Sequence, residues 1–292
     1  MALAHSICRM LPFFALGLVL VPSGNTFRAE AQAPSQDEIR SIAGELAEKI
    51  QKSKAKAEKG QPGPKVLVLI FPLAEELSAA LKSRADRFVV AERQPALDLV
   101  RQLKLPPREY TQLNVAAWLG WKTGAQLVVT GHLAESGGRV RLDLSLVRVD
   151  RERDPVHLRR EFARTAETLA LVESGRPRRQ LRLVESEPQE GEPVAKPGKN
   201  GVGSPKCAWC PNPQFTEEGV RWLRSYQGIV LLRIVVTADG KAKDIEVLQG
   251  AACGLTERAV AAVRQWRFEP ARDADGNPVA VRISIEVNFR TM

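Results

Sequence analysis

Ala259-Val-Ala-Ala-Val-Arg-Gln-Trp-Arg-Phe-Glu-Pro-Ala271 runs from a helical pattern directly into an extended one. Apolar residues recur there at spacings of three and four, which predicts a helix over 255–266 with one apolar face. Asp275-Gly276 then predicts a turn, and residues 279–289 alternate apolar and polar in the manner of a half-buried strand. These residues therefore predict a helix followed by a strand with one apolar face.

A hairpin precedes this helix. Gly228-Ile-Val-Leu-Leu-Arg-Ile-Val-Val-Thr237 is an apolar strand, Asp239-Gly240 is a strong hairpin turn signal, and residues 243–249 alternate as a return strand. A shorter helix is predicted over 214–225. The order helix, strand, strand, helix, strand predicts an α+β domain over 207–292, with a small antiparallel sheet that packs two helices on one face.

Residues 211–290 resemble the TonB C-terminal domain, the periplasmic end of the bacterial energy transducer. Four motifs carry the resemblance, in this order: Pro213-Gln214-Phe215, the hairpin from Gly228 to Gly240, the helix and exit from Ala259 to Ala271, and Gly276-x-Pro278-Val279 with the strand that ends at Phe289. Each motif alone is weak, and the resemblance rests on their order and spacing.

The resemblance implies a site at the edge of the last strand. Family members bind a short segment of an outer-membrane receptor as an added strand, because an exposed edge offers unpaired N–H and C=O groups. By resemblance the receiving edge is residues 280–288, with outward Arg282, Ser284 and Glu286 tuning selectivity. The predicted partner-binding residues are Val281, Arg282, Ile283, Ser284, Ile285, Glu286 and Val287. The same alternation is also expected of any half-buried strand.

Residues 35–173 predict an α/β domain, because strand and helix patterns alternate along them. A helix is expected over 35–59, a strand covered on both faces over 65–71, and single helices over 73–84, 94–104 and 109–123. A hairpin is expected from 126 to 149, then a third strand near 156–163 and a short helix near 165–173. Lys65-Val-Leu-Val-Leu-Ile-Phe71 and Gly124-Ala-Gln-Leu-Val-Val-Thr-Gly131 make this domain similar to the amino-terminal α/β domain of TolB-like envelope proteins, which implies a second protein-binding or assembly module.

The two domains are joined by a segment rich in proline, glycine and charge, residues 174–206, which predicts a flexible linker. At the start of the chain, His5 and Arg9 precede an apolar run of about a dozen residues, and Ala29-Glu30-Ala31 follows. This is the plan of a secretory signal peptide over 1–31, cleaved after Ala31. The expected location is the periplasm, with inner-membrane anchoring as the alternative if this segment is retained.

Composition argues against nucleic acid as a partner. The 292 residues carry a net charge of +9, but the basic residues are scattered, and only 5% of the residues are aromatic. A nucleic-acid surface combines a basic stripe with stacking aromatics, which the sequence lacks. Membrane contact is expected only through partners or an uncleaved amino terminus.

Cys207-Ala-Trp-Cys210 leaves several interpretations open. A disulfide fits an exported protein, whereas a structural zinc site needs four ligands and a redox pair needs a helix amino terminus. Cys253 is either a buried apolar residue or a third candidate for pairing. No Ser-His-Asp arrangement, phosphate loop or paired carboxylate can be placed by spacing, and His132 is interpreted as structural. No catalytic residue, metal or cofactor is predicted.

The sequence therefore predicts a periplasmic binding protein in envelope transport whose partner is an outer-membrane receptor or another envelope protein. The alternative is an assembly or scaffold protein whose TonB-like domain associates with itself, giving a homodimer. A full energy transducer has an uncleaved anchor that engages an inner-membrane motor, and the predicted cleavage departs from that pattern. We expect this chain not to transduce energy alone.

Overall fold

The computed structural model describes residues 34–70, 72–175, 194–198 and 201–290. They form two lobes: the amino-terminal lobe, residues 34–175, and the carboxy-terminal lobe, residues 194–290. The predicted signal peptide lies outside the described residues, and so does the segment 176–193 of the predicted linker. None of the helices in the described ranges is both long enough and apolar enough to cross a membrane.

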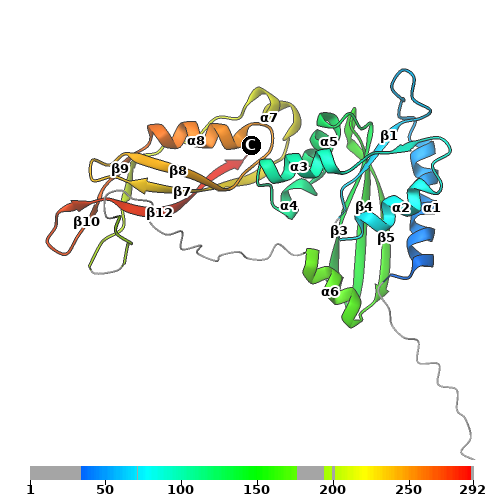
Figure 1. Ribbon diagram of the computed structural model, residues 1–292, viewed down its shortest axis with the longest axis horizontal. Helices are drawn as coiled ribbons and strands as arrows, with labels where there is room; N and C mark the ends of the chain where they lie inside the picture. Colours follow the sequence, from blue (N-terminus) through cyan, green and yellow to red (C-terminus); the bar gives the residue numbers. More distant parts are fainter. Residues whose placement is uncertain (1–33, 71, 176–193, 199–200, 291–292) are drawn as a thin grey trace, which may run out of the picture. The chain divides into compact units, whose positions relative to one another are not determined.

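A five-stranded sheet forms the middle of the amino-terminal lobe (Figure 1). Its order is β2-β1-β3-β4-β5, with β1 parallel to β2 and β3 and with antiparallel pairs beyond β3. The run predicted to be covered on both faces contains β1, whose Val66, Leu67 and Val68 are fully buried, as predicted. The strands are β1 (Lys65–Val68), β2 (Val89–Val90), β3 (Leu127–Ser136), β4 (Arg139–Arg148) and β5 (Arg151–Ala163).

Helices cover both faces of this sheet, so the predicted α/β pattern is present. Alternate residues of β1 enter different clusters: Val66 and Val68 join the one that contains α1 and α2, and Leu67 joins the one that contains α3 and α5. Helix α6 packs on the side of α1 and α2, through Val172. The helices are α1 (Gln36–Lys52), α2 (Ala74–Lys82), α3 (Gln94–Gln102), α4 (Pro107–Tyr110), α5 (Leu113–Lys122) and α6 (Ala166–Gly175).

Two of these helices differ from the sequence prediction. Helix α1 ends at Lys52 rather than near residue 59, because Ser53 caps it and Lys54 leaves it in a left-handed conformation, with φ 54°. The single helix expected over 109–123 is divided into α4 and α5. Gln112 between them is extended, with ψ 140°, so the chain changes direction there.

The carboxy-terminal lobe has a three-stranded antiparallel sheet in the order β12-β7-β8, and α8 packs on β7 and β8 (Figure 1). This is the small antiparallel sheet with helices predicted from the sequence. The lobe also contains two shorter antiparallel ladders, one between β6 and β9 and one between β10 and β11. The elements are β6 (Lys206–Trp209), α7 (Glu217–Trp222), β7 (Gln227–Val236), β8 (Ala242–Gln249), α8 (Leu255–Gln265), β9 (Arg267–Glu269), β10 (Ala271–Arg272), β11 (Pro278–Val279) and β12 (Val281–Arg290).

The turn at Asp239-Gly240 joins β7 to β8, as its sequence predicts. Gly240 has φ +78°, and a Cβ placed on it would lie 2.2 Å from the carbonyl oxygen of Phe268. Its amide N–H donates to Thr237 and its carbonyl accepts from Phe268. Only glycine fits this close approach between the hairpin and the exit of α8.

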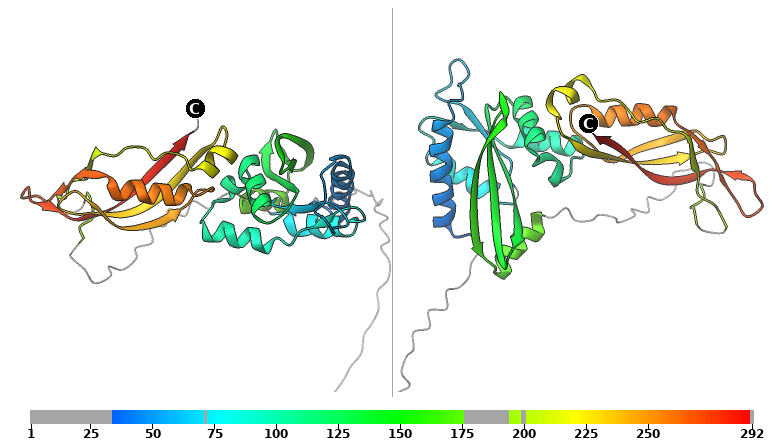
Figure 2. Two further views of the ribbon diagram at one scale, coloured as in Figure 1. Left: turned by 90° about the horizontal axis from the view of Figure 1, so that it is seen from above. Right: turned by 180° about the vertical axis from the view of Figure 1, so that it is seen from behind.

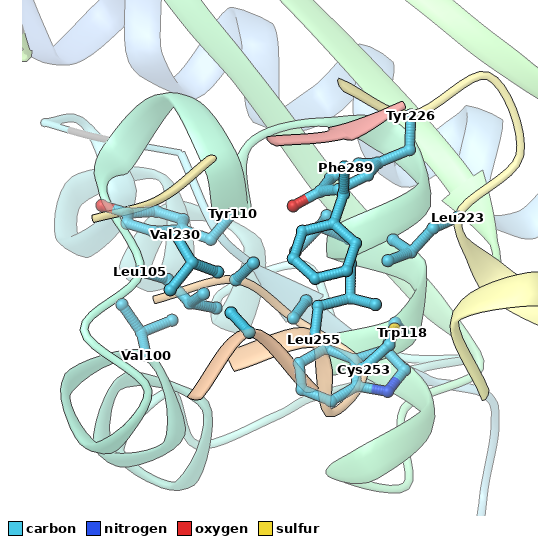
Figure 3. Close-up of a cluster of buried hydrophobic side chains, with 14 of the residues drawn as sticks. Val100, Leu105, Tyr110, Trp118, Leu223, Tyr226, Val230, Cys253, Leu255 and Phe289 are labelled. Atoms are coloured by element: carbon cyan, nitrogen blue, oxygen red, sulfur yellow. The ribbon is translucent and has the colours of Figure 1, made fainter. Parts of the chain in front are cut away.

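One buried cluster contains side chains of both lobes, and Figure 3 shows part of it. Val100, Leu105 and Trp118 of the amino-terminal lobe share it with Leu223 and Tyr226 of the carboxy-terminal lobe. Polar contacts accompany it. Trp118 Nε1 donates to Glu218 Oε1 at 2.9 Å, and the amide of Gly250 donates to the carbonyl of Lys104 at 3.2 Å. The lobes therefore share a core as well as hydrogen bonds.

Candidate functional site: the free edge of β12

Strand β12 is an outer strand of the carboxy-terminal sheet, with β7 beside it on one side (Figures 1 and 2). Its ladder with β7 runs without interruption from Val281, opposite Val236, to Arg290, opposite Gln227. All seven predicted partner-binding residues, 281–287, lie on this strand. An outer strand of this length leaves a row of backbone groups on its far side.

The direction of these backbone groups follows from two hydrogen bonds at the start of β12. The amide of Arg282 donates outward to the carbonyl of Ala195 at 3.4 Å, and the carbonyl of Ala280 accepts from the amide of Ala195 at 3.0 Å. Even-numbered residues therefore turn their N–H and C=O groups away from β7. Because the ladder has no bulge, the same holds for Ser284, Glu286 and Asn288. Within the described part of the chain, no strand pairs with these three residues on the outer side.

The chain itself closes the first end of this edge. Ala195 forms a parallel bridge with Val281, and Gly198 and Val202 are joined by a hydrogen bond of 2.8 Å just beyond it. Ala195 and Val202 are half-buried against the core of the lobe. The open part of the edge therefore begins after Arg282. Ala195 lies within the segment predicted to be a linker, because its proline- and glycine-rich surroundings carry no strand pattern.

The opposite edge of the sheet, β8, is irregular. Its register with β7 shifts twice, between Leu231 and Leu232 and between Arg233 and Val235. Asp244 has φ 47° beside the second shift. Lys104 Nζ donates to the carbonyl of Val247 at 2.5 Å. Bulges and a covering lysine are common means of preventing strand pairing at an edge, so β12 is the regular edge of this sheet.

Along β12 the predicted site residues alternate between side chains that face the core and side chains that face solvent, as expected. Val281 and Val287 are buried in the core, and Ile283 and Ile285 are half-buried. On the other face, Ser284 and Glu286 are exposed, and Arg282 is half-buried. The side chains of the buried valines cannot contact a partner, so these residues can contribute to binding only by holding the strand in place. The two isoleucines retain exposed apolar surface that a further strand would cover.

Cys207, Cys210 and Cys253 lie outside β12. Cys207 and Cys210 are joined by a disulfide at β6, which pairs with β9 next to the exit of α8. Cys253 is a free thiol and fully buried, so burial raises the pKa of its thiol. The disulfide holds the chain where it enters the lobe, and Cys253 packs as an apolar residue.

His132 and His157 lie on the amino-terminal sheet, in β3 and β5, beside polar residues of neighbouring strands. Ser145 Oγ lies 3.0 Å from His157 Nδ1. Asp143, which a triad would place behind the histidine, instead accepts hydrogen bonds of 2.7 Å from Arg141 and Arg159. Burial opposes ionisation of Asp143, but these arginines outweigh it and lower its pKa. The Ser145–His157 pair is therefore a cross-strand contact, and Asp143 is bound by arginines rather than by His157.

No group of three or more His, Cys, Asp or Glu residues in the described ranges is arranged to hold a metal ion. A metal-ligand set therefore does not compete with the β12 edge as the candidate site in that part of the chain.

Comparison with known proteins bears on the same lobe. The family model described as "Gram-negative bacterial TonB protein C-terminal" matches residues 222–291. Among curated proteins, none matched the chain.

Three solved structures with a likeness to the chain are a TonB C-terminal domain, an LpoB C-terminal domain and a TonB2 protein. The TonB C-terminal domain of Pseudomonas aeruginosa has 23% identity and a TM-score of 0.26, covering 34% of this chain and 94% of that one. The LpoB C-terminal domain of Salmonella enterica has 16% identity and a TM-score of 0.32, covering 43% and 96%. The TonB2 protein of Vibrio anguillarum has 20% identity and a TM-score of 0.22, covering 36% and 99%. Residues 222–291, which contain β7, β8, α8 and β12, are a TonB C-terminal domain.

Proposed function

We propose that this protein is a non-enzymatic binding protein of the cell envelope that captures an extended segment of an outer-membrane partner as a strand added to β12. The single observation that carries the proposal is the regular outer edge after Arg282, with its outward backbone groups at Ser284, Glu286 and Asn288. A TonB C-terminal domain supports the envelope setting, because proteins of that family are envelope-associated.

The affinity of such an edge comes first from the backbone. Ser284, Glu286 and Asn288 offer three N–H and three C=O groups, and each hydrogen bond contributes about 0.5–1.5 kcal/mol net. Ordering a flexible segment offsets part of this gain. An added strand would also cover Ile283 and Ile285, so a partner with apolar residues at alternate positions would bind better than a wholly polar one.

A substitution can remove an outward N–H without touching the ladder to β7. Proline at position 286 removes the amide that points away from β7, and proline is tolerated on edge strands whose N–H faces solvent. Glu286→Ala is the matched control, because it removes the same side chain and keeps the amide. The probe is an array of overlapping peptides that covers the periplasm-facing segments of the host's outer-membrane receptors.

We expect array peptides to bind the protein, Glu286→Pro to weaken binding at least tenfold, and Glu286→Ala to change it less than threefold. Thermal unfolding of both variants checks that the lobe is folded. If Glu286→Pro fails to fold, bound peptides carrying N-methyl groups at alternate positions test the same backbone pairing on the intact protein. Equal binding by the two variants, or by N-methylated and unmodified peptides, would refute strand addition at β12.

Self-association through the same edge is the other outcome of this experiment. If the protein forms a dimer by sedimentation velocity and Glu286→Pro makes it a monomer while no array peptide binds, the scaffold function replaces the capture function.

A further inference from the structure

The open edge of β12 ends beside a cavity of about 590 Å³. Asn288, one of the outward residues, lines this cavity together with Arg290 and Gln227 of the same lobe. The amino-terminal lobe supplies Arg108, Glu109 and Gln112. A strand that follows the edge away from Ala195 therefore arrives at a pocket with walls from both lobes.

The charged side chains of this pocket are mainly basic. Arg108 and Arg290 are exposed, and neither forms an ion pair with another side chain in the described ranges. The remaining wall is rich in amides, from Gln112, Gln227 and Asn288. Guanidinium groups form paired hydrogen bonds with carboxylates, and amide N–H groups also donate to them. The chemistry that fits the pocket is an anionic carboxylate.

Glu109 is the only carboxyl group in the wall, and it is poorly placed to oppose an anion. Its side chain is 3% exposed, Oε2 accepts from Gln112 Nε2 at 3.3 Å, and Oε1 has no hydrogen-bond partner. Burial raises the pKa of this carboxyl to about 7, against the lowering effect of Arg108. A carboxyl with a pKa of about 7 is about half protonated at pH 7, so its average negative charge is reduced, and as a neutral acid it can donate to a carboxylate.

We propose that the pocket receives an acidic side chain of the captured segment, held by Arg108 and Arg290, at the end of the added strand that lies beside Asn288. This inference rests on the proposed function and gives the partner a sequence requirement. Backbone pairing alone accepts almost any extended segment, whereas a charge pair at a fixed position selects among them. Arg108 lies outside the TonB C-terminal domain, so the amino-terminal lobe contributes to the selection.

The test selects peptides from a random phage-displayed library on the full-length protein. Selected peptides are resynthesised with each Asp or Glu changed to Asn or Gln, and their affinities are measured by fluorescence polarisation. The protein variants are Arg108→Gln, Arg290→Gln and the double variant. Arg258→Gln, an exposed arginine on α8, is the matched control.

We expect peptides that depend on β12, judged by loss of binding to Glu286→Pro, to share an acidic residue at one end of an alternating apolar stretch. Neutralising that residue should weaken binding five- to twentyfold, and the double arginine variant should abolish this difference while Arg258→Gln preserves it. Raised salt should reduce the difference as well.

The two proposals fail in different ways. Peptides that depend on β12 but tolerate loss of the acid, or that keep their acid preference in the double variant, would overturn only the proposal that the pocket binds an acidic side chain. A selection that yields no β12-dependent peptide would overturn strand capture and the pocket with it.

Discussion

Glu218 Oε1 accepts a hydrogen bond of 2.9 Å from Trp118 Nε1, although the two residues are 100 positions apart. The same oxygen lies 2.7 Å from Lys122 Nζ, and Lys122 also lies 4.7 Å from the ring centroid of Trp121. Glu218 therefore joins α7 of the carboxy-terminal lobe to α5 of the amino-terminal lobe. Arg108 and β12 are on different lobes. The junction at Glu218 therefore helps to hold them in their positions relative to each other.

We expect Glu218→Gln to lower the free energy of unfolding by about 1 kcal/mol, because it removes the ion pair with Lys122 at a site that is partly exposed. Glu218→Ala should cost more, since the indole N–H of Trp118 then loses its acceptor as well. Urea unfolding of the whole protein measures both. Glu217→Gln, on the same turn of α7, is the control and should be neutral.

The pH dependence of this junction follows from its charge. Burial raises the pKa of Glu218, but hydrogen bonds from Lys122 and Trp118 outweigh it, so the pKa lies below 4.5 in the folded state. A depressed pKa contributes stability that is present above 4.5 and is lost as the pH falls through the folded value. The difference between wild type and Glu218→Gln should therefore shrink below pH 4.5. A difference that grows on acidification would contradict this assignment.

The sequence predicted β12 well and its surroundings poorly. Alternation from residue 279 to 289 sets which side chains face the core, and Asp239-Gly240 sets the hairpin, because both are local properties. The pairing of Ala195 with Val281 is not local. It joins a segment without strand pattern to an edge more than eighty residues away, so composition alone assigned it to a linker.

The contribution of the amino-terminal lobe to the pocket beside Asn288 could not be predicted from the sequence either. Glu109 follows Pro107 and Arg108, and a carboxylate at the start of a helix is ordinarily exposed to solvent. Glu109 lines the same pocket as Gln227 and Phe289 of the other lobe, a proximity that only the tertiary structure shows. The pocket proposed to bind an acidic side chain therefore has no sequence signal in either lobe when each is considered alone.

We expect wild-type protein to lose stability as the pH rises from 5 to 8.5, because of Glu109. Its folded pKa of about 7 is higher than its ordinary value of 4.5, so the folded state binds the proton more tightly than the unfolded state. Stability from this group is then fully present below pH 4.5 and lost as the pH rises through 7. Because the unfolded state begins to ionise near pH 4.5, the loss between pH 5 and pH 8.5 is roughly 2–3 kcal/mol, out of roughly 3–4 kcal/mol for the whole shift.

Glu109→Gln removes the titration and keeps a polar side chain of similar size. Melting temperatures at pH 5 and pH 8.5 should differ less for this variant than for wild type. Glu76→Gln, an exposed position on α2, should leave the wild-type difference unchanged. Parallel pH profiles for Glu109→Gln and wild type would show that Glu109 is ionised in the folded protein.

Cys253 should resist thiol reagents in the folded protein. It is fully buried, and burial raises the pKa of its thiol, so the reactive thiolate is scarce at neutral pH. Peptide mapping after iodoacetamide treatment should find the Cys253 peptide unmodified in native buffer and fully modified in 6 M guanidinium, because only hyperstable domains have unfolding midpoints above about 5 M. If Cys253 is labelled in the native state as fast as in the unfolded chain, its side chain is accessible to solvent and the core around it is not packed as described.

The hairpin of the TonB C-terminal domain can be tested with two glycines that share a left-handed conformation. Gly240 has φ +78° and Gly276 has φ +84°, but a Cβ on Gly240 would lie 2.2 Å from the Phe268 carbonyl oxygen, whereas a Cβ on Gly276 would meet nothing within 4 Å. Gly276→Ala should cost about 1–2 kcal/mol for the conformation alone. Gly240→Ala should cost at least 1 kcal/mol more, about the low end for a forced backbone shift. Urea unfolding measures both, and equal losses would mean that the hairpin does not lie against the exit of α8.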